Sequence, residues 1–184
     1  MPQFSIRFPK NEVPAWAKRY SYGEDKRVLE IGKRSRSAGY YTRDDFLEVC
    51  EWKTRGRPRR HYQRNSEEDV RRVTTTALSS ADEKTRIMSL IGAHGGLRGV
   101  SWPTASVLLH LAHKEPYPIL DFRALWSLQV APRSYYTFDF WQDYVQACRA
   151  LAVQCDVSMR NLDRALWEYS NRNQRKEMCM SRNG

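Results

Sequence analysis

The chain has few cysteines and lacks long apolar runs. Its four cysteines are scattered over 184 residues, which is typical of reduced thiols inside the cell rather than of a disulfide framework. No apolar run approaches the roughly 18 residues that span a bilayer. Residues 1–10 lack the apolar core of a signal peptide. We therefore expect a cytoplasmic protein with no membrane partner.

Patterns typical of metal ligands are also missing. His94, His110 and His113 are isolated in the sequence, whereas a metal site needs several ligands that converge on one point. We predict no metal site and no cofactor, and we expect a monomer.

Strand patterns are nearly absent, apart from a possible extended arm over residues 3–8. Apolar residues instead recur at helical spacing behind polar residues that favour helix starts. We predict helices that begin after Thr42, Ser66, Ser80 and Thr137. The helix after Ser80 is expected to end at Gly92 or at Gly95 and Gly96.

The fold class that follows is all-α. We expect one domain over residues 1–170, built either as a single compact body or as two helical lobes around a cleft. The last helix is expected over about 158–169, and the basic tail over 171–184 is expected to be flexible.

Positive charge is what the chain has in excess. The sequence holds 31 Lys and Arg against 21 Asp and Glu, a formal net charge of +10, which attracts polyanions. Much of the charge lies in one Gly/Pro-broken stretch, at Lys53, Arg55, Arg57, Arg59, Arg60 and Arg64, with the rings of Trp52 and Tyr62 among them. Arginine suits phosphates and aromatic rings suit unstacked bases. An ordinary solvated basic loop is the alternative interpretation.

A glycine turn followed by a helix stands at Leu97-Arg-Gly-Val-Ser-Trp-Pro-Thr-Ala105. Such a turn binds phosphate, because free backbone N–H groups and the positive end of the helix dipole point at one spot. We expect Ser101 to cap a helix that has Pro103 in its first turn and continues over 104–113. The predicted phosphate contacts are Gly99, Val100, Ser101, Trp102 and Thr104.

A carboxylate follows this helix at Asp121, after a loop that contains Pro116 and Pro118. Asp121 precedes an apolar helical run, so capping that helix is its commoner role. The spacing between Asp121 and the glycine turn favours a second role, in which the carboxylate lies beside the ligand that the turn binds.

These residues resemble the helix-hairpin-helix DNA glycosylases of the endonuclease III superfamily, whose hairpin reads roughly LPGVGxxTA and whose catalytic Asp follows one helix later. Leu97, Gly99, Val100, Thr104 and Ala105 match the hairpin, and Asp121 matches the acid. The resemblance is strongest over residues 97–126 and extends over about 40–130. It implies two helical lobes around a cleft and a partner that is double-stranded DNA. It also implies a nucleoid-associated location within the cytoplasm.

Ser101 and the cysteines depart from the family pattern, and Pro103 differs from the members that also cleave the DNA backbone. Family members that also cleave the backbone carry a Schiff-base lysine where this chain has Pro103, which excludes imine chemistry at that position. Ser101 replaces the second glycine of the turn, so a residue with a Cβ must reach a backbone conformation that suits glycine. Cys148 and Cys155 have the spacing of the first two iron–sulfur ligands, but no close pair follows, so we predict no cluster.

The resemblance thus implies a monofunctional glycosylase that hydrolyses the N-glycosidic bond of a flipped-out base. Asp121 would stabilise the oxocarbenium-like sugar and activate water. In the family, the corresponding helix-to-loop junction supplies the base pocket and the wedge that fills the gap in the duplex. The candidates for these roles are Trp52, Lys53, Asn65 and Tyr62. Base excision repair and defence against phage with modified DNA would use the same chemistry.

Two other functions remain open from the sequence. The chain would be a non-catalytic helix-hairpin-helix module for duplex DNA if Asp121 only caps its helix. It would be a helical interaction protein for RNA or an acidic partner if the glycine turn binds no phosphate, and duplex DNA would then bind weakly at physiological salt.

Overall fold

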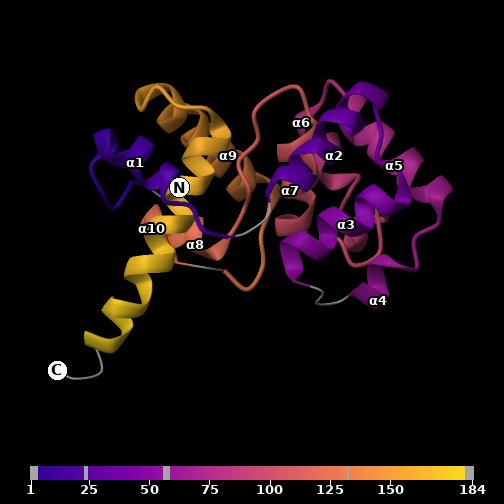
Figure 1. The fold of residues 1–184 in the computed structure, drawn as a ribbon. Helices are drawn as coiled ribbons and strands as arrows, with labels where there is room; N and C mark the ends of the chain where they lie inside the picture. The colour runs from indigo at the N-terminus through magenta and orange to yellow at the C-terminus, as the bar shows by residue number, and fades with distance from the viewer. Residues whose placement is uncertain (1–3, 23–24, 56–58, 132, 181–184) are drawn as a thin grey trace. The chain divides into compact units, whose positions relative to one another are not determined.

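The computed structural model describes residues 4–22, 25–55, 59–131 and 133–180, and the side chains of these residues up to 174. All regular structure within these ranges is helical, so the all-α prediction is confirmed (Figure 1). The chain folds into two compact units. We call residues 24–117 the central unit, and residues 1–23 with 118–184 the terminal unit.

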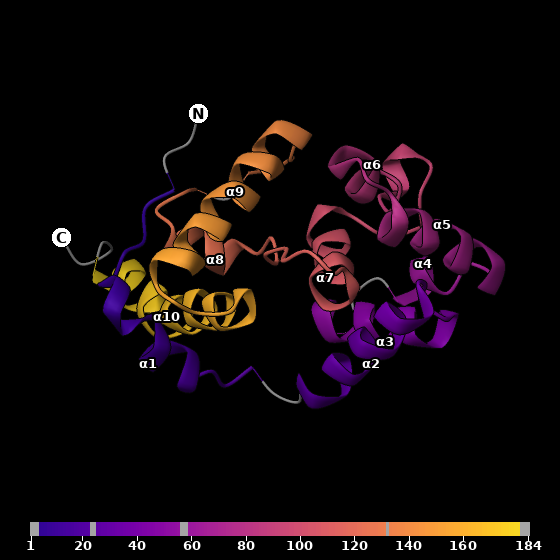
Figure 2. The same cartoon turned by 90° about the horizontal axis from the view of Figure 1, so that it is seen from above.

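The terminal unit combines an N-terminal segment with the C-terminal part of the chain. Its elements are η1 (Lys10–Glu12), α1 (Val13–Lys18), α8 (Phe122–Ser127), α9 (Phe138–Gln154) and α10 (Met159–Met180). Helices α1 and α8 pack against α10, and Figures 1 and 2 both show α1 beside α10. The predicted N-terminal arm is not a regular strand within residues 4–8, although the Ser5 and Arg7 N–H groups donate to the Leu128 and Ser127 carbonyls.

The central unit is arranged around one apolar helix. Its elements are α2 (Asp25–Ala38), α3 (Arg43–Thr54), α4 (Arg59–Tyr62), α5 (Glu67–Ser79), α6 (Glu83–Met88), η2 (Gly92–His94) and α7 (Trp102–Ala112). Helix α7 packs against α2, α3, α5 and α6 and buries nine of its 11 residues. A helix that is apolar on nearly every side is stable only when it is surrounded in this way.

The absence of a side chain at Gly32 lets α2 pack closely against α7. A Cβ there would lie 2.5 Å from the backbone oxygen of Leu111. The close approach also lets the Arg36 guanidinium donate to the carbonyls of Leu111 and Ala112, at the end of α7. A cation at that end satisfies exposed carbonyls and opposes the negative end of the helix dipole. Helix α2 was not predicted from the sequence, because half of its residues are charged and Gly32 stands in its middle.

The predicted helix starts are largely confirmed. Thr42, Ser66 and Thr137 each accept a backbone N–H at the start of a helix, from Asp45, Asp69 and Phe140. Capping bonds of this kind are each worth about 1 kcal/mol.

Three predicted helix boundaries are corrected. Ser80 does not cap α6, because the Asp82 carboxylate accepts the Thr85 N–H at 2.8 Å and takes that place. Helix α6 then ends at Met88, before the glycines. Helix α7 begins at Trp102, directly after Ser101, as predicted. Helix α10 continues past Tyr169 to Met180, so residues 171–180 of the predicted flexible tail are helical.

Membrane crossing would require a long and apolar helix. None of the helices in the described part of the chain meets both conditions.

Candidate nucleic-acid interface

The connection between α6 and α7 closes on itself through backbone hydrogen bonds. The Leu97 N–H donates to the Leu90 carbonyl at 3.1 Å, and the Gly92 N–H donates to the Val100 carbonyl at 2.9 Å. Gly99 has φ +84°, a left-handed conformation that favours glycine. The side chains of Leu97 and Val100 are buried, whereas Gly99 and Ser101 are exposed. The turn therefore presents backbone on its outer side.

Asn65 fixes this turn from the neighbouring segment. Its side-chain oxygen accepts the Arg98 N–H at 2.8 Å, and its side-chain nitrogen donates to the Arg98 carbonyl at 3.0 Å and to the Tyr62 carbonyl at 2.8 Å. Only 4% of Asn65 is exposed. Buried amide groups bonded on both sides hold one backbone geometry, because leaving either side unpaired is costly.

Tyr62 and His61, at the end of α4, lie directly under Gly99. A Cβ on Gly99 would meet the Tyr62 ring at 2.9 Å and the His61 Cβ at 3.0 Å. The Tyr62 hydroxyl lies 3.3 Å from the Thr104 hydroxyl in α7, and burial raises the pKa of Tyr62. Tyr62 and Asn65 were predicted as pocket or wedge residues. The structure gives both of them contacts that hold the turn.

The start of α7 lies just beyond the turn. Ser101 has φ −110°, an ordinary extended conformation, so the strain expected from the loss of a glycine is absent. The predicted side-chain cap by Ser101 is also wrong, because its hydroxyl makes no capping bond to α7. Pro103 stands in the first turn as predicted, Thr104 is buried and Trp102 is 8% exposed. In this first turn Pro103 has no N–H, and the Ala105 N–H donates to the Ser101 carbonyl at 2.8 Å.

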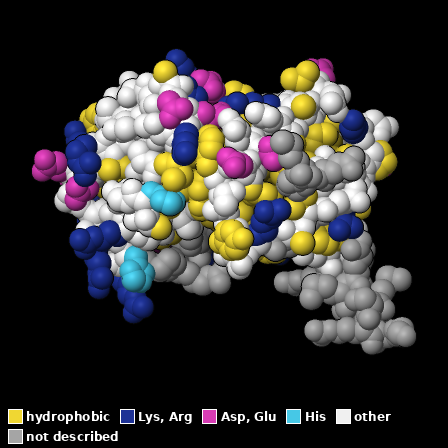
Figure 3. Space-filling model, turned by 180° about the vertical axis from the view of Figure 1, so that it is seen from behind, with side chains coloured by type: hydrophobic (Ala, Val, Ile, Leu, Met, Phe, Trp, Pro, Cys, Tyr) yellow, Lys and Arg dark blue, Asp and Glu magenta, His cyan; other side chains and the backbone are white. Residues whose placement is uncertain are grey.

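The basic stretch borders the same turn through α4. Figure 3 shows Lys, Arg and His side chains gathered at the corner of the central unit where α4 lies. Arg60 and Arg98 are exposed, and Arg59 is 3.1 Å from Glu51. Arg55 ends α3 with φ +51° and is also exposed. Arg57 lies outside the described residues.

Trp52 and Lys53, the first two pocket candidates, belong to the last turn of α3. Both are half-buried. Their role toward a base stays a prediction.

Asp121 lies in the terminal unit, at the start of α8. Its carboxylate accepts the Arg123 N–H at 2.9 Å, which confirms the predicted cap, and the side chain is half-buried. Burial raises the pKa of Tyr144 strongly, and the charges of Cys148, Asp163 and Asp121 raise it further. The Tyr144 hydroxyl donates to the Ile119 carbonyl at 2.8 Å, just before Asp121. The shared cleft between Asp121 and the turn stays a prediction.

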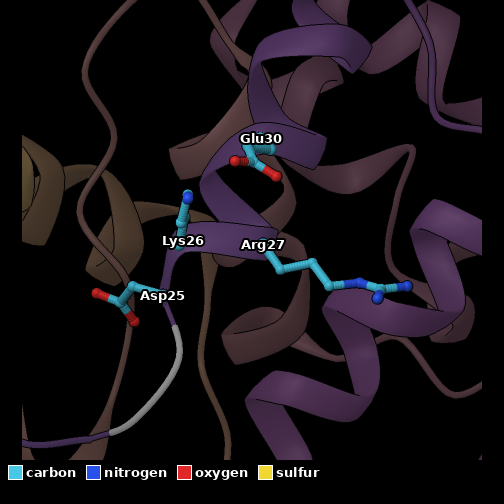
Figure 4. A pocket seen from close by; sticks show the side chains of 4 residues that line it. All are labelled: Asp25, Lys26, Arg27 and Glu30. Carbon is cyan, nitrogen blue, oxygen red and sulfur yellow. The ribbon is translucent and has the colours of Figure 1, made fainter.

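Other candidate sites are less suited to an anionic ligand. A hollow at the start of α2 is lined by Asp25, Lys26, Arg27 and Glu30 (Figure 4). Arg27 points away from the other three residues and pairs with Glu48 of α3. Among the residues that the structure describes, no group of His, Cys, Asp and Glu side chains could hold a metal ion.

Sequence reasoning missed the role of Asn65 as the residue that holds the turn, and it missed Arg98 as the exposed cation within the turn. Arg98 could have been found from its place next to Gly99, whereas the bonds of Asn65 depend on tertiary structure. No protein-family model, curated protein or solved structure matches this chain.

Proposed function

We propose that the protein is a monofunctional DNA glycosylase that hydrolyses the N-glycosidic bond of a flipped-out damaged or modified base in duplex DNA. The observation that carries the proposal is the turn at Gly99. It is held by Asn65, exposes backbone and leads into a helix start without a side-chain cap. Duplex phosphates are the ligand class that such a turn suits. The proposed motif is a helix-hairpin-helix formed by α6, the turn and α7.

Binding at this turn would combine backbone N–H groups with nearby cations. Arg98 lies within the turn, and Arg60 stands in the short helix beneath it. Contacts to phosphate position a protein on the duplex without reading its sequence. The turn and α4 would therefore anchor the strand, and the base would be selected elsewhere.

The chemical step is assigned to Asp121. The bond between C1′ and the base nitrogen breaks, the base leaves with the bonding electrons, and a water oxygen adds to C1′. A negative carboxylate stabilises the positive charge that develops on the sugar and can accept a proton from the attacking water.

The test is base release from duplexes that carry uracil, alkylated bases, oxidised bases or modified cytosines, followed by alkali to reveal abasic sites. Asp121→Asn should lower the rate by roughly two to four powers of ten, because the charge is lost. Asparagine caps helices as well as aspartate does, so α8 should remain folded. Asp82→Asn is the control, since the Asp82 carboxylate also caps a helix, at the start of α6. Alkali-sensitive breaks that persist undiminished in Asp121→Asn would exclude Asp121 as the catalytic acid.

The second candidate is a non-catalytic module that binds duplex DNA. The capping bond of Asp121 favours it, because that bond alone accounts for an aspartate at this position. The module would bind duplex DNA with the same turn and would release no base from any of these substrates.

A further inference from the structure

Three aromatic rings form a cluster in the terminal unit, whereas the turn and the basic stretch belong to the central unit. The Trp167 ring of α10 meets Tyr20 edge-on at 5.4 Å between centroids and meets Tyr22 edge-on at 5.1 Å. The Tyr20 and Tyr22 rings are stacked at 6.3 Å. All three side chains are only partly buried. We call these three residues the aromatic platform.

A buried carboxylate holds the platform in place. Ser21, between the two tyrosines, donates its N–H and its hydroxyl to one Glu168 oxygen at 3.1 and 2.9 Å. The other Glu168 oxygen accepts from Arg172, and Glu168 is 0% exposed. Because Glu168 follows Trp167 in α10, one residue fixes all three rings. A surface that is ordered before binding loses less conformational entropy when a ligand arrives.

Arginines surround the platform. The Arg123 guanidinium carbon lies 5.1 Å from the Trp167 ring centroid, and those of Arg160 and Arg164 lie 5.4 and 5.6 Å from the Tyr20 centroid. Cations already occupy positions over these rings, so a cationic ligand is disfavoured. A flat ring that carries a negative phosphate has the complementary chemistry, since bases stack on aromatic side chains and phosphates pair with arginine.

The platform adjoins the proposed catalytic acid through α8. Arg123, which contacts Trp167, is also the residue whose N–H bonds to the Asp121 carboxylate. Phe122 between them is 50% exposed, and the Arg123 guanidinium carbon lies 5.2 Å from its ring centroid. A base on the platform would therefore belong to a nucleotide at or next to the one that meets Asp121.

We propose that the aromatic platform of Trp167, Tyr20 and Tyr22, with Arg123, binds an unstacked nucleobase of a DNA strand. The inference rests on the proposed function in taking DNA as the ligand. The unstacked base has two sources, a single strand or an unpaired base within a duplex. Trp52 and Lys53, the sequence-based pocket candidates, belong to the central unit and are not members of the platform.

The experiment compares binding of three fluorescent DNAs by anisotropy: a dT oligonucleotide, a duplex with one bulged base and the fully paired duplex. Trp167→Leu should weaken binding to the dT oligonucleotide, the bulged duplex or both by about five- to a hundredfold, with the paired duplex unchanged. Trp167→Phe should keep most of the affinity, because the ring remains. Tyr22→Leu should weaken the same DNAs and serves if Trp167→Leu fails to fold.

Tyr40→Leu is the matched control, because Tyr40 also lies under an arginine, with the Arg71 guanidinium carbon 4.5 Å from its ring centroid, but stands in the central unit. A loss on the dT oligonucleotide assigns the site to single strands, and a loss on the bulged duplex alone assigns it to a base leaving the duplex. Unchanged affinity for both, or an equal loss on the paired duplex, would overturn the proposal. This binding measurement does not depend on base release. The platform proposal can therefore fail while the Asp121 test succeeds, and it can hold while the Asp121 test fails.

Discussion

At the scale of single residues, the turn depends on a glycine that has two separate reasons to be glycine. Gly99 has φ +84°, and a Cβ there would also meet Tyr62 and His61. Gly95, four residues earlier, has the same φ, but a Cβ there would meet nothing within 4 Å. Substitutions at Gly95 and Gly99 therefore separate the cost of backbone strain from the cost of steric contact.

Gly99→Ala should lower the free energy of unfolding by about 2 to 5 kcal/mol, combining left-handed strain of about 1 to 2 kcal/mol with overpacking of about 1 to 3 kcal/mol. Gly95→Ala should lower the free energy of unfolding only by the contribution of the strain. Urea denaturation measures both variants. Gly99→Ala should also weaken duplex binding. Equal losses of stability in the two variants would show that the contact with α4 contributes nothing.

The sequence revealed individual residues better than their partners. Thr42, Ser66 and Asp121 could be identified as caps, because a cap depends on a side chain and an N–H two or three residues away. Ser80 was chosen wrongly because Asp82 offers a competing cap within the same turn of chain. The role of Asn65 could not be predicted, since its partner Arg98 is 33 residues away in the sequence.

At the scale of elements, α6 and the loop after α7 are joined by a charged network. Arg86, 6% exposed, donates to Glu115 and to the Tyr117 hydroxyl, both at 2.7 Å. His113, which directly follows α7, lies beside this network, is 2% exposed and accepts the Glu115 N–H on Nδ1 at 3.0 Å. Burial first, and then the charges of Arg86 and Lys114, lower the pKa of His113 below 6.5, whereas Glu115 opposes them.

The stability of the protein should therefore fall as the pH drops below about 6.5. The unfolded state takes up the His113 proton more readily than the native state, so each pH unit between the two pKa values costs up to about 1.4 kcal/mol. His113→Gln should remove that part of the pH dependence while keeping an acceptor for Glu115. Urea denaturation at pH 7.5 and 5.5 measures it, with exposed His94→Gln as the control. The same pH dependence in wild type and His113→Gln would contradict this account.

Helix existence was easier to predict than helix length. The helices α3, α5, α7 and α9 were found because their apolar positions recur at helical spacing. Helix α2 was missed because half of its residues are charged and because Gly32, which lets α2 pack on α7, is an unfavourable residue in a helix interior. Helix α10 was predicted too short, since the sequence beyond Tyr169 is polar and carries no apolar stripe.

At the scale of the whole molecule, the positive charge is shared between the two units. Residues 24–117 hold 18 Lys and Arg against 13 Asp and Glu, and the terminal unit holds 13 against 8, so each has a net charge of +5. An even distribution agrees with a phosphate-binding turn in one unit and a base-binding platform in the other. It also means that net charge alone cannot tell which unit contacts the duplex.

Salt dependence of binding can separate the units, because each phosphate contact releases bound counterions. Log affinity for a paired duplex should fall linearly with log salt, and Arg98→Gln should reduce that slope by roughly 1. Arg71→Gln is the control, since Arg71 is exposed but already pairs with Glu67. Trp167→Leu should leave the slope for the paired duplex unchanged, because its ring contacts no phosphate. A slope that stays the same in Arg98→Gln would exclude the turn as the place where the central unit contacts the DNA backbone.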